Sequence, residues 1–212
     1  MRSLFRPRAP KPFVTKNGHK NCAVGILAVQ GDFALHAKML DRIGIPWRLI
    51  KHAGELQQVD SLIMPGGEST TMLKFFESEG MGAGIRNFAS EGKPVFGTCA
   101  GAILLAKEVL APPQEHLGLL DITVERNAYG RQIDSAIRTG ECPELSSHPI
   151  EMVFIRAPII RRLGDRVRVL GRADGLPVLV EQDNLLAATF HPELTGDETI
   201  HKYFVGKIVA RG

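Results

Sequence analysis

The first half of the sequence alternates short, uninterrupted apolar runs with stretches of helical periodicity, and this alternation constrains the fold more than any other feature. Residues 23–29 read AVGILAV, which is typical of a strand buried on both faces of a sheet. Residues 32–43 show helical spacing, with Phe33 and Leu40 on the same side. The same patterns predict strands over residues 47–50, 59–64 and 94–97, a helix from Ser69 onward and a helix over residues 100–109.

The repeated order of strand and helix, joined by short loops, predicts a mostly parallel sheet covered by helices on both faces. This is a three-layer, doubly wound α/β fold. The second half is richer in strands, with a closing helix expected over residues 199–210. Its expected strands cover residues 119–126, 149–156, 167–170, 178–181 and 185–190. No repeat or linker is visible after residue 21, so we expect residues 22–212 to form one domain.

The N-terminal segment, residues 1–21, differs from the rest of the chain in charge. It carries six basic residues and no acidic one, and without them the net charge of +3 would become negative. We therefore expect a basic, disordered extension and no nucleic-acid partner. Binding to phosphates or a membrane surface, organelle targeting, and a start codon placed too early are the alternative explanations of this segment.

The composition also indicates whether the chain binds a metal, enters a membrane or is secreted. No run approaches the roughly 18 apolar residues of a membrane helix, and no apolar segment follows the basic N-terminus as in a secretion signal. The three cysteines, Cys22, Cys99 and Cys142, form no C-x-x-C pair, which disfavours a zinc site. An odd number of cysteines without a signal peptide favours reduced thiols. We expect a cytoplasmic protein with no metal, no organic cofactor and no membrane association.

Residues 97–101 read GTCAG and lie between a predicted buried strand and a predicted helix. A small residue on each side of a central nucleophile is the layout of the nucleophile elbow, in which a strained turn exposes the side chain. The N–H groups and positive dipole end of the following helix favour a thiolate at Cys99. The alternative is a buried structural cysteine, which is how we interpret Cys22 and Cys142.

A histidine and a carboxylate follow the last predicted strand, in the segment FHPE at residues 190–193. Residues i and i+2 of an extended segment point to the same side, so Glu193 can reach one ring nitrogen of His191 while the other faces Cys99. This is the arrangement of a catalytic triad. The remaining histidines have no comparable partners in the sequence and are expected to be surface or structural residues: His19, His36, His52, His116, His148 and His201.

A glycine-rich loop, PGGESTT at residues 65–71, follows the third predicted strand. Glycines let the backbone approach a ligand closely, so the N–H of Gly67 and that of Ala100 are candidates for an oxyanion hole. Ser69 and Thr70 are good N-cap residues for the helix that follows. A phosphate-binding loop is the alternative, but the G-K-[ST] ending is absent.

Together these motifs resemble the triad, or class I, glutamine amidotransferases, which have a flavodoxin-like fold. The resemblance is closest to the glutaminase subunits of pyridoxal 5′-phosphate synthases and covers about residues 22–209. It rests on AVQGD around Gly31 and on PGGESTTM, GTCAGAILLAK, HLGLLD, VERNAYGRQIDS, FIRAP and FHPELTGD. The chain departs from the family's pattern in its N-terminal extension and in the 111–115 loop, which contains Pro112 and Pro113.

The resemblance implies a role for individual residues. Cys99 would be the nucleophile, and His191 and Glu193 its partners. The residues that would bind glutamine are Gly67, Glu68, Ser69, Arg126, Ile155 and Arg156. The family hydrolyses L-glutamine to L-glutamate and ammonia, without metal or cofactor. It passes the ammonia to a (β/α)₈-barrel synthase subunit within a large hetero-oligomer that makes pyridoxal 5′-phosphate, the active form of vitamin B6.

Three other functions are compatible with parts of the pattern. The chain could supply ammonia to another synthase, such as that of imidazole glycerol phosphate, although the VERNAYGRQ segment argues against it. It could be a peptidase- or chaperone-like cysteine hydrolase of the same fold, which the late His-x-Glu disfavours. A scaffold subunit without activity is the non-enzymatic alternative, and the complete set of nucleophile, base and orienting carboxylate disfavours it.

Overall fold

The computed structural model describes residues 23–126 and 135–209, and a seven-stranded sheet forms its centre. The strand order is β10-β11-β12-β4-β3-β1-β2, and all pairs from β12 to β2 are parallel. Only β11 runs antiparallel to both of its neighbours. The bounds are β1 Val24–Leu27, β2 Trp47–Ile50, β3 Ser61–Met64, β4 Val95–Thr98, β10 Arg168–Ala173, β11 Leu176–Gln182 and β12 Leu185–Ala188.

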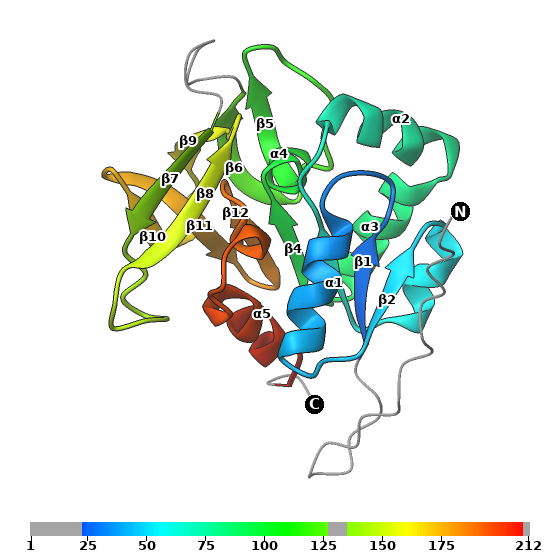
Figure 1. Ribbon diagram of the computed structural model, residues 1–212. Coiled ribbons are helices and arrows are strands. Elements are labelled where there is room, and N and C mark those ends of the chain that lie inside the picture. The colour runs from blue at the N-terminus through cyan, green and yellow to red at the C-terminus, as the bar shows by residue number, and fades with distance from the viewer. Residues whose placement is uncertain (1–22, 127–134, 210–212) are drawn as a thin grey trace, which may run out of the picture.

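Helices cover both faces of this sheet (Figure 1). Alternate residues of the central strands pack into two different cores, because successive side chains of a strand point to opposite faces. Leu62 and Val95 belong to one core with α2, α3 and α4, whereas Ile63 and Phe96 belong to the other with α1 and α5. The helices are α1 Phe33–Arg42, α2 Ser69–Ser78, α3 Met81–Ser90, α4 Ala100–Leu105 and α5 Thr199–Val209. The predicted three-layer, mostly parallel α/β fold is confirmed.

Two smaller sheets extend the second half of the chain. One has the order β5-β6-β9, and the other is the antiparallel pair β7-β8. Their strands are β5 Ala106–Leu110, β6 Leu120–Glu125, β7 Ser135–Gly140, β8 Ile150–Ile155 and β9 Ile159–Leu163. The sequence analysis missed β7, β9, α3 and the short 3₁₀ helix η1 over Ala53–Gln58.

The helix predicted over residues 100–109 is wrong in its second half. α4 ends at Leu105, and Ala106–Leu110 is strand β5, which pairs in parallel with β6. The local sequence AKEVL has reasonable helix formers, so local preference alone does not explain the strand. Hydrogen bonding to β6, a partner more than ten residues away, overrides that preference.

The parallel strands β1, β3, β4 and β12 end at the same edge of the sheet, and each is followed by a segment that the sequence singled out. Ligands of doubly wound folds bind outside this edge. Within residues 23–126 and 135–209 no helix is long and apolar enough to cross a membrane. The predicted N-terminal extension and most of the VERNAYGRQ segment lie outside the described residues.

Candidate active site

Cys99 lies in a sharp turn between β4 and α4, with backbone angles φ = +46° and ψ = −102°. A positive φ is unfavourable for any residue with a side chain and costs on the order of 1–3 kcal/mol, which the surrounding structure must offset. Gly101 makes the turn possible, because a Cβ there would lie 2.1 Å from the backbone oxygen of Met64. The predicted elbow geometry is therefore present, and the thiol of Cys99 faces a pocket at the edge of the sheet.

His191 and Glu193 follow β12 and are both buried. The Nδ1 atom of His191 lies 2.8 Å from Oε1 of Glu193, and a carboxylate can only accept, so Nδ1 carries the proton. The other ring nitrogen, Nε2, has no regular hydrogen bond within the described residues. Burial alone would lower the pKa of His191, but Cys99 and Glu193 outweigh it and raise that pKa. The arrangement favours the positively charged form of the His191 ring.

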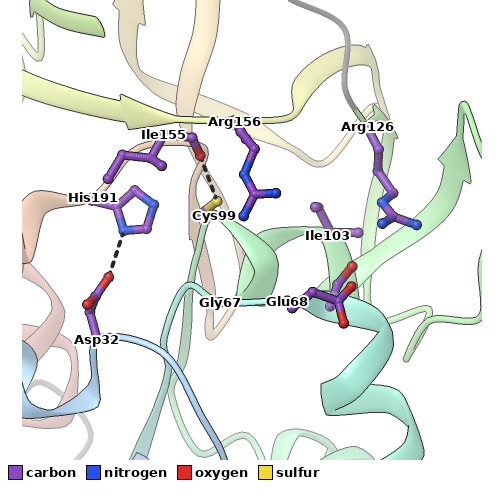
Figure 2. A pocket seen from close by; sticks show the side chains of 10 residues that line it. Asp32, Gly67, Glu68, Cys99, Ile103, Arg126, Ile155, Arg156 and His191 are labelled. Atoms are coloured by element: carbon purple, nitrogen blue, oxygen red, sulfur yellow. Dashed lines mark hydrogen bonds and ion pairs between the residues drawn. The ribbon is translucent and has the colours of Figure 1, made fainter. Parts of the chain in front are cut away.

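The β8 strand closes the site above Cys99. The Sγ atom of Cys99 lies 3.7 Å from the backbone oxygen of Ile155, the last residue of β8. Arg156, the next residue, has φ = +43°, so its backbone is also strained. Figure 2 shows the Arg156 side chain descending beside Cys99, with Arg126 farther along the pocket.

The loop after β3 approaches the triad so closely that a side chain would not fit. A Cβ on Gly66 would lie 2.4 Å from Cε1 of His191 and 3.4 Å from the Cβ of Cys99. Gly67 has φ = +148°, a conformation that other residues rarely adopt. Gln30 supports the loop by donating a hydrogen bond from Nε2 to the backbone oxygen of Glu68. Gly67 lines the pocket, and Ala100 is the first residue of α4.

Glu68, and not Ser69 or Thr70, is the N-cap of α2. Its carboxylate accepts hydrogen bonds from the backbone N–H groups of Thr70, at 3.2 Å, and Thr71, at 2.9 Å. Both threonine hydroxyls also donate to it at 2.5 Å. These hydroxyl groups, more than the backbone, lower the pKa of Glu68 to about 2. The predicted N-cap was wrong because a carboxylate two residues before Thr70 takes both backbone donors.

These segments enclose a cavity of about 220 Å³. That is smaller than the roughly 300–1,000 Å³ of sites for drug-sized ligands, and it suits an amino acid. Glu193 lies behind His191. Eight predicted residues line the cavity: Gly67, Glu68, Ser69, Cys99, Arg126, Ile155, Arg156 and His191.

The sequence analysis missed two lining residues, Asp32 and Ile103. Oδ2 of Asp32 lies 3.9 Å from Nδ1 of His191 (Figure 2). The signal for Asp32 was its place in the AVQGD segment between β1 and α1, at the edge where the other motifs meet. The signal for Ile103 was its position one helical turn after Cys99, on the helix that follows the elbow.

Histidines outside the triad were expected to be surface or structural residues. His36 is fully buried in α1, and its Nε2 lies 3.4 Å from Oε2 of Glu193, a partner that the sequence did not indicate. Cys142 behaves as expected of a structural cysteine. It is buried, and burial, assisted by Asp197, raises the pKa of its thiol to about 11.

Among the described residues, one group of three side chains of the kinds that bind metal ions lies close together. Asp32, His191 and Glu193 each offer an atom within 4.8 Å of the others. The His191–Glu193 hydrogen bond already accounts for two of them, and a metal on Nδ1 would displace its proton. The absence of a metal stays a prediction.

The fold and site define a class: doubly wound α/β proteins with a cysteine elbow and a histidine–carboxylate pair at the same sheet edge. Comparison with known proteins narrows the class. Residues 26–210 match the model of the SNO glutamine amidotransferase family. A solved structure described as a glutamine amidotransferase superposes with a TM-score of 0.83 at 46% identity, covering 88% of this chain and 98% of that one.

Two curated relatives are similar over most of their length. The pyridoxal 5′-phosphate synthase subunit PdxT of Koribacter versatilis is 51% identical, over 89% of this chain and 96% of its own. The PdxT subunit of Solibacter usitatus is also 51% identical, over 87% of this chain and 98% of its own length. The chain belongs to the SNO glutamine amidotransferase family. The predicted family is confirmed.

Proposed function

We propose that the chain hydrolyses L-glutamine to L-glutamate and ammonia and is the glutaminase subunit of a pyridoxal 5′-phosphate synthase. The observation that carries the proposal is the strained turn at Cys99, which presents the thiol to an amino-acid-sized cavity beside the His191–Glu193 pair. Membership of the amidotransferase family and the names of the relatives agree with it.

In the first half of the reaction, the Cys99 thiolate attacks the side-chain amide carbon of glutamine. The tetrahedral oxyanion accepts hydrogen bonds from the N–H groups of Gly67 and Ala100. The C–N bond then breaks, and the His191 imidazolium donates its Nε2 proton to the departing nitrogen. Ammonia leaves, and a γ-glutamyl thioester remains on Cys99.

In the second half, neutral His191 removes a proton from water as the water oxygen attacks the thioester carbon. The C–S bond breaks, glutamate leaves, and the thiolate and imidazolium are restored together. Glu193 fixes the ring through its contact with Nδ1 and stabilises the positive charge that the ring carries.

The remaining residues that line the cavity would bind the substrate. Arg126 and Arg156 line the cavity and carry the charge to bind its α-carboxylate or to order the loop around it. Strain at Arg156 suits a residue held for function. The Glu68 side chain is occupied with capping α2, which favours bracing of the loop over direct contact with the α-ammonium group.

The ammonia requires an acceptor. We propose a (β/α)₈-barrel synthase subunit in a large hetero-oligomer, which would receive ammonia without its release to bulk water. The relatives' description as synthase subunits supports a complex of this kind. A glutaminase for another synthase is the alternative, and a pull-down against purified candidate synthases separates the two.

The test is glutamate release from glutamine, measured for the full-length chain with and without a purified barrel subunit of pyridoxal 5′-phosphate synthase. We expect turnover with the partner and none for Cys99→Ser, with both proteins equally folded by circular dichroism. If the wild-type chain with the partner releases no glutamate, the proposal fails.

A further inference from the structure

A second buried histidine lies behind the proposed triad, on the side of Glu193 away from His191. Oε1 of Glu193 accepts the hydrogen bond of His191, whereas Oε2 lies 3.4 Å from Nε2 of His36. The same Nε2 lies 3.3 Å from the hydroxyl of Thr98. Within the described residues Oε2 has no hydrogen bond of regular geometry, so this contact, shared with Thr98, is its polar support.

His36 is itself held by a second histidine, which comes from α5, the helix that packs beside α1 on the same face of the central sheet. Nδ1 of His36 lies 2.9 Å from Nε2 of His201 in α5. Both rings are completely buried, and both meet the ring of Phe96 edge-on. α1 and α5 share one face of the sheet (Figure 1). The series from His201 through His36 to Glu193 therefore joins α1 to two neighbouring segments near the end of the chain.

Both histidines are neutral at physiological pH. Burial lowers the pKa of His36 well below its ordinary value, and the charges that His201 and His191 would carry lower it further. Burial also lowers the pKa of His201 to about 4. Within the part of the chain that the structure describes, Asp32, ahead of α1, and the Cys99–His191 pair are further ionisable groups near Glu193. Each neutral ring therefore carries one proton, and its position has to be assigned.

Contacts assign the protons. If His36 carried its proton on Nδ1, the lone pair of Nε2 would face the Glu193 carboxylate, and His201 would bury an Nδ1–H group without an acceptor in the described residues. With the proton on Nε2, His36 directs an N–H toward Oε2 and Thr98, and accepts from Nε2–H of His201. Only this arrangement places a donor against the carboxylate.

We propose that His36 is a positioning residue for the triad, with its Nε2–H, oriented by His201, holding the second oxygen of Glu193. The expected effects on kcat rest on the proposed function, whereas the contacts and the proton on His36 do not depend on it. His36 does not line the substrate cavity, so it acts on the rate through Glu193 and not on glutamine binding. Because it is neutral, it fixes the carboxylate without cancelling the charge that stabilises His191.

The kinetic test compares His36→Met with His36→Gln, two side chains of similar length and helix propensity that differ in having a terminal N–H donor. With saturating barrel partner, we expect His36→Met to lower kcat about tenfold, the equivalent of about 1.4 kcal/mol, with KM within about twofold. His36→Gln should retain kcat within about threefold. Leu40→Val, in the same helix and core, controls for loosened packing and should leave kcat unchanged.

The second arm tests whether His36 acts through Glu193. In a Glu193→Gln background the additional His36→Met change should lower kcat less than about twofold, because the carboxylate that it positions is gone. A further tenfold loss in that background would overturn the inference. So would Met and Gln variants with equal kcat.

The third arm needs neither substrate nor a folded Met variant. ¹⁵N–¹H spectra of the histidine rings in the wild-type protein, assigned with His36→Gln, should show His36 neutral and protonated on Nε2 across pH 6–8. A proton on Nδ1, or a charged ring, would contradict the proposal. If the wild-type complex hydrolyses no glutamine, the proposed function fails, while this spectrum still decides the placement of the His36 proton.

Discussion

The Nδ1 atom of His191 lies 2.8 Å from Oε1 of Glu193, and a single proline separates the two residues in the chain. Pro192 begins a short 3₁₀ turn over Pro192–Leu194, which directs both side chains to the same side. The contact sets the tautomer of His191 and leaves its Nε2 for the proposed proton transfers.

Electrophiles that mimic glutamine should label Cys99 alone. Cys142 is buried and the pKa of its thiol is raised to about 11, so it is almost entirely protonated at neutral pH. Mass spectrometry of the labelled chain after proteolysis measures the site. Cys142→Ser should leave labelling unchanged, and modification at Cys142 with Cys99 untouched would refute the assigned nucleophile.

The members of the triad should act as one unit. His191→Ala and the double variant Cys99→Ala/His191→Ala should have similarly negligible glutaminase rates, because losses within such a unit are not additive. Glu193→Gln should cost less than loss of the imidazole itself. Steady-state kinetics of the complex tests this, and losses that multiply would indicate that the residues do not share a site.

The Glu68 carboxylate should stabilise the start of α2 in a pH-dependent way. Its folded pKa of about 2 lies below the ordinary value of about 4.3, so its contribution is complete above that value and is lost as pH falls toward 2. Glu68→Ala should cost about 0.5–2 kcal/mol of unfolding free energy at pH 7, as for other N-caps, and less at pH 3. Urea unfolding measures both. Glu77→Ala, an exposed change in the same helix, is the control, and an equal effect at both pH values would contradict the assignment.

The glycine loop should control activation by the partner. We expect the isolated chain to turn over slowly because an N–H of the Gly66–Gly67 segment points away from the oxyanion until docking turns it. One such donor is worth on the order of 10²–10³ in rate. Gly67→Ala should blunt the partner's stimulation more than it weakens glutamine binding, since alanine resists φ = +148°.

The matched control for that variant is Gly206→Ala in α5, where an added methyl group meets no atom within 4 Å. It should leave stimulation unchanged. Gly66→Ala should abolish activity outright, because the methyl group would displace the His191 ring. An isolated wild-type chain that already turns over at the rate of the saturated complex would disprove control by the partner.

Sequence patterns were sufficient wherever the determining interactions are local. Buried parallel strands appear as apolar runs, and small residues on both sides of Cys99 mark the strained turn. The His191–Glu193 contact joins residues two apart, so the spacing itself predicted it. These local signals identified the main strands of the central sheet, the order of the motifs and, with the resemblance, the residues that line the cavity.

Tertiary structure alone decided the features that depend on distant partners. Strand β5 exists because β6 pairs with a segment whose own preference is helical. His36 meets Glu193 across 157 positions of the chain only because α1 packs against the 3₁₀ helix η2, which covers Pro192–Leu194. No periodicity of a single segment encodes such contacts, since they arise from which faces the completed sheet brings together and from the burial that follows.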